Sequence, residues 1–118
     1  MRLVKLTAVF LLLTSIGYTQ NNNSKTILEV DGVCGMCKKR IEKASLKTKG
    51  VKSAVWNLET HQLQLIYNAR KVDIETIKSN ITAVGHDTKT LKASVEAYEK
   101  LDNCCRYRDL KVVKDHKL

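Results

Sequence analysis

The chain has 118 residues, of which 43% are hydrophobic and 5% aromatic, and its formal net charge is +9. This length leaves room for one small domain with extensions, and the apolar content is ordinary for a folded globular protein. The low aromatic content argues against an RNA-recognition domain, which stacks bases on aromatic side chains. No Ser/His/Asp constellation, phosphate-binding loop or paired-carboxylate site is visible, so we expect the protein not to be an enzyme.

Residues 1–19 have the pattern of a secretory signal peptide. Arg2 and Lys5 precede an apolar run, and small residues follow it. The run is shorter than the ~20 residues that span a bilayer, so we expect cleavage near Gly17 or Thr19 rather than an anchor. The mature protein is then expected to be exported, in the periplasm or secreted.

Positive charge on an exported protein narrows the range of partners. Export argues against nucleic acid, and the excess of lysine and arginine instead favours an acidic protein face or weak contact with an anionic membrane surface. A solvated, lysine-rich surface without a partner is the simpler interpretation of the same charge.

Beyond a polar linker at 20–24, the hydrophobic pattern predicts a strand, a helix, two strands, a helix and a strand. The first strand covers 26–30 and places Ile27 and Leu28 in the core. The later elements are a helix from Cys37 with Ile41 and Ala44 inside, a hairpin of 53–58 and 62–67 around Glu59-Thr60, a helix capped by Asp73 and ended by Gly85, and a weak edge strand at 86–91.

This order of elements is that of a ferredoxin-like βαββαβ sandwich, an α+β fold with two helices on one face of a four-stranded antiparallel sheet. Residues 25–91 are expected to form this domain. We expect the C-terminal extension, 92–118, to contain a short helix over 93–101, the vicinal pair Cys104-Cys105 and a basic, frayed tail.

Cys34 and Cys37 stand three positions apart at the expected start of the first helix. The N–H groups and positive dipole end there favour thiolate over thiol, and Lys38, Lys39 and Arg40 add positive charge. Such a pair suits either a soft metal ion or thiol–disulfide redox chemistry, and alone does not choose between them. A thioredoxin-type enzyme relies on a cis-proline facing its CxxC, and this chain contains no proline.

The positions around the CxxC carry a family resemblance. They are Cys34, Cys37, Ile41, Glu42, Ala44, Gly50-Val51, Asn57-Leu58, Thr60 and Val84-Gly85. With these residues the chain resembles the heavy-metal-associated domain family of copper chaperones, mercury-binding periplasmic proteins and metal-pump N-terminal domains, over about residues 25–91. Asp31-Gly32-Val33 stands where the family usually has Gly-Met-Thr.

The resemblance implies that Cys34 and Cys37 bind a soft ion, Cu(I) foremost. The ion would pass by ligand exchange to a metal-transporting or metal-accepting protein in the cell envelope. Lys38, Lys39 and Arg40 would then steer docking to an acidic partner surface.

Three further residues are candidate metal ligands. His86 begins the last expected strand, which lies beside the CxxC loop in such a fold, where it would be a third ligand or a hydrogen-bond partner of a thiolate. The expected last strand leads ~20 Å away from the CxxC loop, and a helix after it would lead ~18 Å back. Cys104 and Cys105 could therefore return to the site. Otherwise they form disulfides within or between chains, or a separate thiol site, because adjacent cysteines rarely bond to each other without strain.

The number of ligands decides which metal is expected. Two cysteines alone favour Cu(I), because thiolates select soft ions, whereas Zn(II) usually takes four ligands. Adding His86 and a tail cysteine would favour Zn(II) or a three-coordinate copper site. Met36, between the two cysteines, is expected to be a loop hydrophobe rather than a ligand. A monomer, or a dimer linked by metal or disulfide, fits these expectations.

Overall fold

The computed structural model describes residues 22–117, so the predicted signal peptide and its cleavage positions lie outside the described residues. The elements in chain order are β1 (Asn23–Glu29), α2 (Gly35–Lys47), β2 (Val51–Trp56), β3 (Gln62–Asn68), α3 (Ile74–Ala83), α4 (Val95–Glu99), the 3₁₀ turn η2 (Asn103–Cys105) and α5 (Leu110–Asp115). Within 22–117, none of the helices has the length and apolar character needed to cross a membrane.

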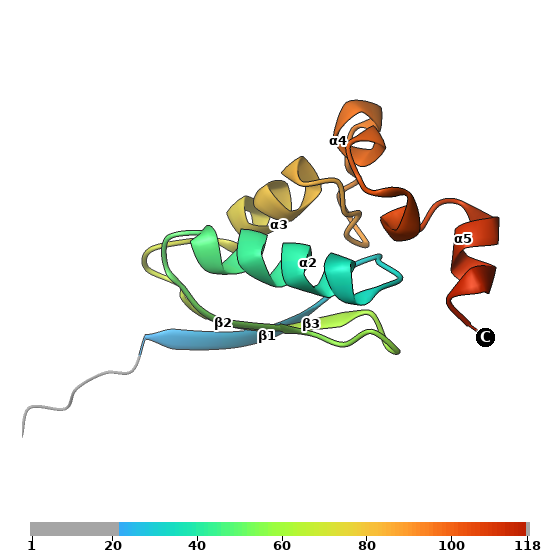
Figure 1. Ribbon diagram of the computed structural model, residues 1–118. Helices are drawn as coiled ribbons and strands as arrows, with labels where there is room; N and C mark the ends of the chain where they lie inside the picture. Colours follow the sequence, from blue (N-terminus) through green and yellow to red (C-terminus); the bar gives the residue numbers. More distant parts are fainter. Residues whose placement is uncertain (1–21, 118) are drawn as a thin grey trace, which may run out of the picture.

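Three strands form an antiparallel sheet in the order β1-β3-β2, and α2 and α3 cover one face of it (Figure 1). The predicted hairpin is confirmed as β2 and β3, with Trp56 opposite Leu63 and Ala54 opposite Leu65. All four of these side chains are buried, because alternate residues of each strand point toward the helices. The α+β architecture is therefore the one expected.

β1 begins at Asn23, so the sheet includes the last two residues of the predicted linker at 20–24. Its burial alternates along the strand: Leu28 packs against the core, whereas Ile27 is 56% exposed. The prediction that both lie in the core was wrong for Ile27, because neighbouring side chains of a strand point to opposite faces.

The fourth strand predicted at 86–91 is absent from the described part of the chain. A single antiparallel bridge joins Thr88 to Val30, where that strand would begin beside β1. The chain then turns back on itself, since the N–H and the hydroxyl of Thr88 both donate to the carbonyl oxygen of Leu91, at 2.8 and 3.0 Å. The sheet is three-stranded because this turn directs the chain toward the C-terminal extension.

The two long helices bury their predicted inner faces, and α3 also has its predicted N-cap. Asp73 accepts from the N–H of Thr76 at 2.8 Å and so begins α3, and Gly85, with φ of +101°, follows its end. A Cβ at Gly85 would lie 2.8 Å from a backbone oxygen of α4, so the glycine also permits the extension to pack closely. The buried apolar residues of these helices are Ile41 and Ala44 on α2, and Ile77 and Ile81 on α3.

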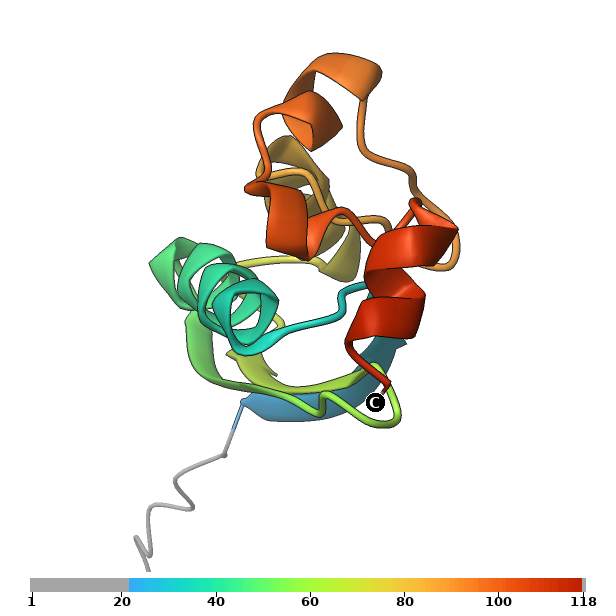
Figure 2. The ribbon, with the colours of Figure 1, turned by 45° about the vertical axis from the view of Figure 1, so that its right-hand side comes forward.

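The C-terminal extension folds against the domain, with η2 beside the start of α2 and α5 near the loop 31–33 that precedes it (Figure 2). Arg108 donates to both carboxylate oxygens of Asp87, at 2.7 and 3.2 Å, and its guanidinium lies 4.3 Å above the ring of Tyr98. The hydroxyl of Tyr107 donates to the carbonyl oxygen of Gly85 at 2.7 Å. The prediction of a frayed tail was wrong, because these side chains bind the tail to the segment that follows α3.

Candidate metal centre

The CxxC pair sits at the start of α2. Cys34 is the N-cap residue, and its sulfur accepts a hydrogen bond from the N–H of Cys37 at 3.4 Å. The two sulfurs lie 3.2 Å apart, and both side chains are buried. Because helical geometry turns both side chains to one side, the two thiols face a common point, as the spacing predicts.

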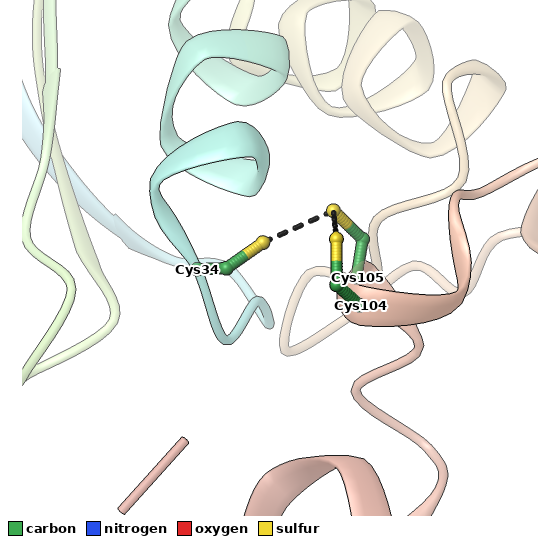
Figure 3. A group of neighbouring side chains, drawn as sticks. All are labelled: Cys34, Cys104 and Cys105. Carbon is green, nitrogen blue, oxygen red and sulfur yellow. Dashed lines mark hydrogen bonds between the residues drawn. The ribbon is translucent and has the colours of Figure 1, made fainter. Parts of the chain in front are cut away.

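The turn η2 brings a third thiol to this point. The sulfur of Cys105 lies 3.0 Å from that of Cys34, and the sulfur of Cys37 lies 3.9 Å from the carbonyl oxygen of Cys105. Figure 3 shows Cys34 and Cys105 pointing toward each other from the two segments. Cys105 therefore returns to the CxxC, although it does so through a turn and a short helix rather than along a fourth strand.

Cys104 occupies the outer side of the same cluster. Its sulfur is 3.9 Å from that of Cys105, and the sulfurs of Cys34, Cys104 and Cys105 all lie within 4.8 Å of one another. Its thiol also donates to the Met36 thioether sulfur at 3.6 Å. Met36 is 46% exposed, so it is not packed as a loop hydrophobe. All four cysteines are free thiols.

His86 is fully buried and both of its ring nitrogens have partners. Nδ1 lies 2.8 Å from the carbonyl oxygen of Asp31, and Nε2 lies 3.3 Å from the Arg40 guanidinium. Burial lowers the pKa of His86 to about 4, so the ring is neutral at neutral pH. Nδ1–H then donates to Asp31 and Nε2 accepts from Arg40. In this geometry His86 fixes the loop before the CxxC and presents no free nitrogen to a metal.

The thiols of the cluster differ in acidity. Burial raises the pKa of Cys34 to about 12, and burial also raises the pKa of Cys37. Burial opposes ionisation of Cys105 too, but the Arg40 guanidinium and the Cys34 and Cys37 thiols stabilise its thiolate and lower its pKa. The prediction that the helix start favours thiolate at the CxxC was wrong for the reduced protein, because Arg40 places the first negative charge on Cys105.

The three predicted docking residues have different surroundings. The ammonium of Lys38 donates to Glu42 at 2.7 Å and to the carbonyl oxygen of Trp56 at 2.8 Å. Arg40 faces the site, as described above. Lys39 is exposed and has no polar partner among residues 22–117, so it is the cation of this group that is free to meet another protein.

Trp56 supports the CxxC loop from beneath. Its indole N–H donates to the carbonyl oxygen of Val30 at 3.0 Å. A Cβ at Gly32 would lie 3.0 Å from the Trp56 ring and 3.0 Å from the Cβ of Cys37, so any larger residue would have to displace one of these neighbours. The indole thus lies under the loop that contains Asp31-Gly32-Val33 in place of the usual Gly-Met-Thr.

The role of Trp56 could not be predicted, because the hairpin pattern explains this residue as part of the core. The roles of Tyr107 and Arg108 could not be predicted either, because these residues follow the cysteines in a basic segment without periodicity. Aromatic and arginine side chains alternating next to a cysteine pair were the available indication of a folded segment.

The donor set suits a soft metal ion. With metal–sulfur bonds of about 2.3 Å, three sulfurs around one ion lie about 4.0 Å apart, and four in a tetrahedron lie about 3.8 Å apart. The observed separations of 3.0 and 3.2 Å at Cys34 would have to widen by less than about 1 Å. The sulfurs of Cys34, Cys104 and Cys105 form a group without a carboxylate, and Cys37 lies 3.2 Å from Cys34 beside it. Such a set of thiols matches the preference of soft ions such as Cu(I).

Comparison with known proteins places the domain in a family. Residues 27–87 match the model of the "Heavy-metal-associated domain". The chain is 36% identical over 67 residues to the copper chaperone CopZ of Staphylococcus epidermidis, which covers 56% of this chain and 98% of CopZ. It is 40% identical over 65 residues to CopZ of Staphylococcus aureus, covering 54% and 96% of the two chains. These relatives are chaperones and not enzymes, in agreement with the sequence prediction.

Solved structures agree with this assignment. A CopZ metallochaperone matches with a TM-score of 0.54 at 39% identity, covering 55% of this chain and 98% of that chain. Oxidized MerP from Ralstonia metallidurans matches with a TM-score of 0.55 at 22% identity, covering 57% and 94%, which shows a shared fold alone. Cys104 and Cys105 lie beyond the residues that the family model matches. Because that match spans more than half of the sequence, the chain belongs to the heavy-metal-associated domain family.

Proposed function

We propose that this protein binds Cu(I) through the thiolates of Cys34, Cys37 and Cys105, and that it carries or buffers the ion for a metal-accepting protein. The observation that carries the proposal is the convergence of three buried sulfurs at the start of α2, with Cys34 lying 3.2 Å from Cys37 and 3.0 Å from Cys105. The similarity to copper chaperones supports it.

Three buried thiolates suit Cu(I) better than Zn(II), which usually takes a fourth ligand in a tetrahedron. The fourth thiol of the cluster, Cys104, is exposed and lies on its outer side. A Zn(II)-binding module is therefore the second candidate function, and it would require Cys104 to complete the tetrahedron. Both candidates share the same three inner ligands.

A third thiolate favours buffering over rapid delivery, because an ion that leaves the site has to break three metal–sulfur bonds rather than two. Delivery would proceed by ligand exchange, in which a cysteine thiolate of the acceptor replaces one of the three thiolates. A segment of the copper-exporting P-type ATPase of Staphylococcus haemolyticus is 36% identical to this chain over 66 residues, 8% of that protein. We propose a domain of such a pump as the acceptor, with Lys39 meeting acidic residues on its surface.

The proposed location is outside the cytoplasm. It rests on the charged, apolar and small-residue pattern of residues 1–19. In an oxidising compartment the thiols have to stay reduced to bind a metal, so an exported carrier needs either early loading or a reducing partner. An exported redox role for Cys34 and Cys37 has less support, because the relatives are copper chaperones.

Native mass spectrometry of the reduced mature protein under anaerobic conditions tests the proposal. The protein is offered Cu(I) and Zn(II) separately, beside the Cys34→Ser/Cys37→Ser variant. We expect the wild type to retain Cu(I) and the variant to lose the ion that is held at the CxxC. A wild type that binds neither metal and instead forms a Cys34–Cys37 disulfide would replace the carrier function with a redox or structural one.

A further inference from the structure

We infer that the site holds two Cu(I) ions, an inner one on the CxxC and a second, outer one bound by Cys104, Cys105 and the Met36 thioether. This inference rests on the proposed function and deepens it, since it assigns the vicinal cysteines and Met36 to a metal position of their own. The two positions share the Cys105 thiolate, so the ions lie in one cluster rather than in separate sites.

The inner position is complete without Cys104. The sulfur of Cys34 lies 3.2 Å from that of Cys37 and 3.0 Å from that of Cys105, so an ion bound at Cys34 has two further sulfurs next to it. The inner ion therefore does not need Cys104 as a ligand. Its thiol is nevertheless part of the same group of sulfurs, because Cys34, Cys104 and Cys105 lie within 4.8 Å of one another.

The outer position has separations close to those of a bound ion. Three sulfurs around one ion with bonds of about 2.3 Å are about 4.0 Å apart. The sulfurs of Cys104 and Cys105 are 3.9 Å apart, and those of Cys104 and Met36 are 3.6 Å apart. These two separations at Cys104 already suit a bound ion, with Cys105 bridging to the inner ion.

Packing does not explain the conformation of Met36. The side chain is 46% exposed at the second position of α2, where a polar residue would be equally compatible with the helix. Instead its sulfur faces the Cys104 thiol, 68 residues away in the sequence. A thioether is a soft, neutral ligand of the kind that Cu(I) accepts beside thiolates.

The charges of a two-ion cluster can be balanced by neighbouring groups. Two Cu(I) ions and four thiolates carry a net charge of about −2, and each thiol releases its proton to solvent as it binds. The Arg40 guanidinium lies beside the cluster, 3.3 Å from the buried His86 ring, and the first N–H groups of α2 point toward it. The exposure of Cys104 makes the outer ion the one that meets solvent and partners.

Counting Cu(I) ions at saturation tests the inference. The reduced, mature full chain is titrated anaerobically with Cu(I) in the presence of excess glutathione, which keeps weakly held ions from being counted, and bound ions are counted by native mass spectrometry. The variants are Cys104→Ser and Met36→Leu, with Asn103→Ser as a control in the same turn. The methyl NMR signal of Met36 is followed in parallel.

We expect two ions in the wild type and the control, one in Cys104→Ser, and a weakened second ion in Met36→Leu. The Met36 methyl resonance should shift with the second equivalent and not with the first. One ion in the wild type would overturn the inference while leaving the proposed function intact, and no ion would overturn both. Two ions in every variant would also overturn it, because Cys104 and Met36 would then not be the ligands.

Discussion

The two parts of the thiol cluster are held in different ways. The CxxC loop is fixed by main-chain geometry and by the core, through the Cys34 cap and the close contact of Gly32 with Trp56. The Cys104-Cys105 turn is held by side chains: Leu101 and Cys105 are buried in the core, and Arg108 pairs with Asp87.

The comparison with relatives follows the same division. The heavy-metal-associated match includes the CxxC and ends before the turn. The residues that match the family therefore include the CxxC, whereas Cys104 and Cys105 belong to a segment outside the match.

The largest expected effect on Cu(I) affinity comes from Cys34, which contacts both the other CxxC cysteine and the C-terminal turn. Cys34→Ser removes the sulfur that lies closest to both Cys37 and Cys105. Changes to residues that merely orient ligands typically cost ~10–100-fold in affinity, so loss of this ligand should cost well over ~100-fold. Competition with a Cu(I) chelator measures it, and Cys104→Ser is the control, with a much smaller loss for the first ion. Equal losses in the two variants would contradict the central position of Cys34.

His86, which contacts the loop before the CxxC, makes the free energy of unfolding depend on pH. Its pKa is about 4 in the folded protein, lowered chiefly by burial, against an ordinary value near 6.5. Between these two pH values the unfolded chain therefore binds more protons than the folded protein does. The free energy of unfolding rises by up to ~3 kcal/mol as the pH increases from about 4 to 6.5, and the full gain is kept above pH 6.5. Urea unfolding at several pH values measures it.

The matched variants for this pH dependence are His86→Gln and His116→Gln. The exposed His116 variant should keep the slope between pH 4 and 6.5, whereas the His86 variant should flatten it. An unchanged slope in His86→Gln would show that another group is responsible.

On the extension side, Arg108→Leu leaves the Asp87 carboxylate, 7% exposed, without its charge partner. Breaking a buried ion pair costs about 3–5 kcal/mol, and partial exposure of Arg108 reduces this to about 2 kcal/mol. We expect chemical denaturation to show that loss, together with weaker Cu(I) binding because Cys105 is less well held. Arg106→Leu, in the same segment, is the control without an ion pair. Arg108→Leu with full stability and unchanged binding would show that the extension is not held by this contact.

The ionisation of Asp87 adds a second, separate pH window. Burial opposes its ionisation, but the hydrogen bonds from Arg108 and Ala93 outweigh burial and lower its pKa. This contribution to stability is present above the ordinary value near 3.9 and is lost as pH falls through the lower folded value. Acid unfolding below about pH 4 should therefore be less steep in Arg108→Leu.

The smallest effect is expected from surface charge. Lys39→Glu should slow metal transfer to an acidic acceptor by several-fold at low salt, with the difference disappearing at high salt because exposed charges are screened. Lys43→Glu, one helical turn further from the loop, should change the rate less. A rate independent of both substitutions would remove the proposed role in docking.

Much of the domain could be predicted from local patterns. Alternation identified the β2–β3 hairpin, and Asp73 and Gly85 marked the ends of α3. The spacing of Cys34 and Cys37 at a helix start was enough to bring their sulfurs together, because helical geometry alone determines it.

The remainder depends on contacts between distant residues. The missing fourth strand reflects a turn at Thr88 that continues into the extension anchored by Asp87 and Arg108, 21 residues apart. The acidity of Cys105 depends on Arg40, which reaches it only because the extension folds back. Such pairings leave no periodic pattern in the sequence. The chain length alone could suggest that a third thiol returns to the CxxC, but it could not predict where that thiol lies.

The central claim is that Cys105 joins the CxxC as a ligand of the first ion. X-ray absorption spectroscopy of the reduced protein with one equivalent of Cu(I) counts the sulfur neighbours of copper directly. We predict three sulfurs in the wild type and in Cys104→Ser, and two in Cys105→Ser. Two sulfurs in the wild type, unchanged by Cys105→Ser, would contradict the claim and leave the extension as a cover over an ordinary two-cysteine site.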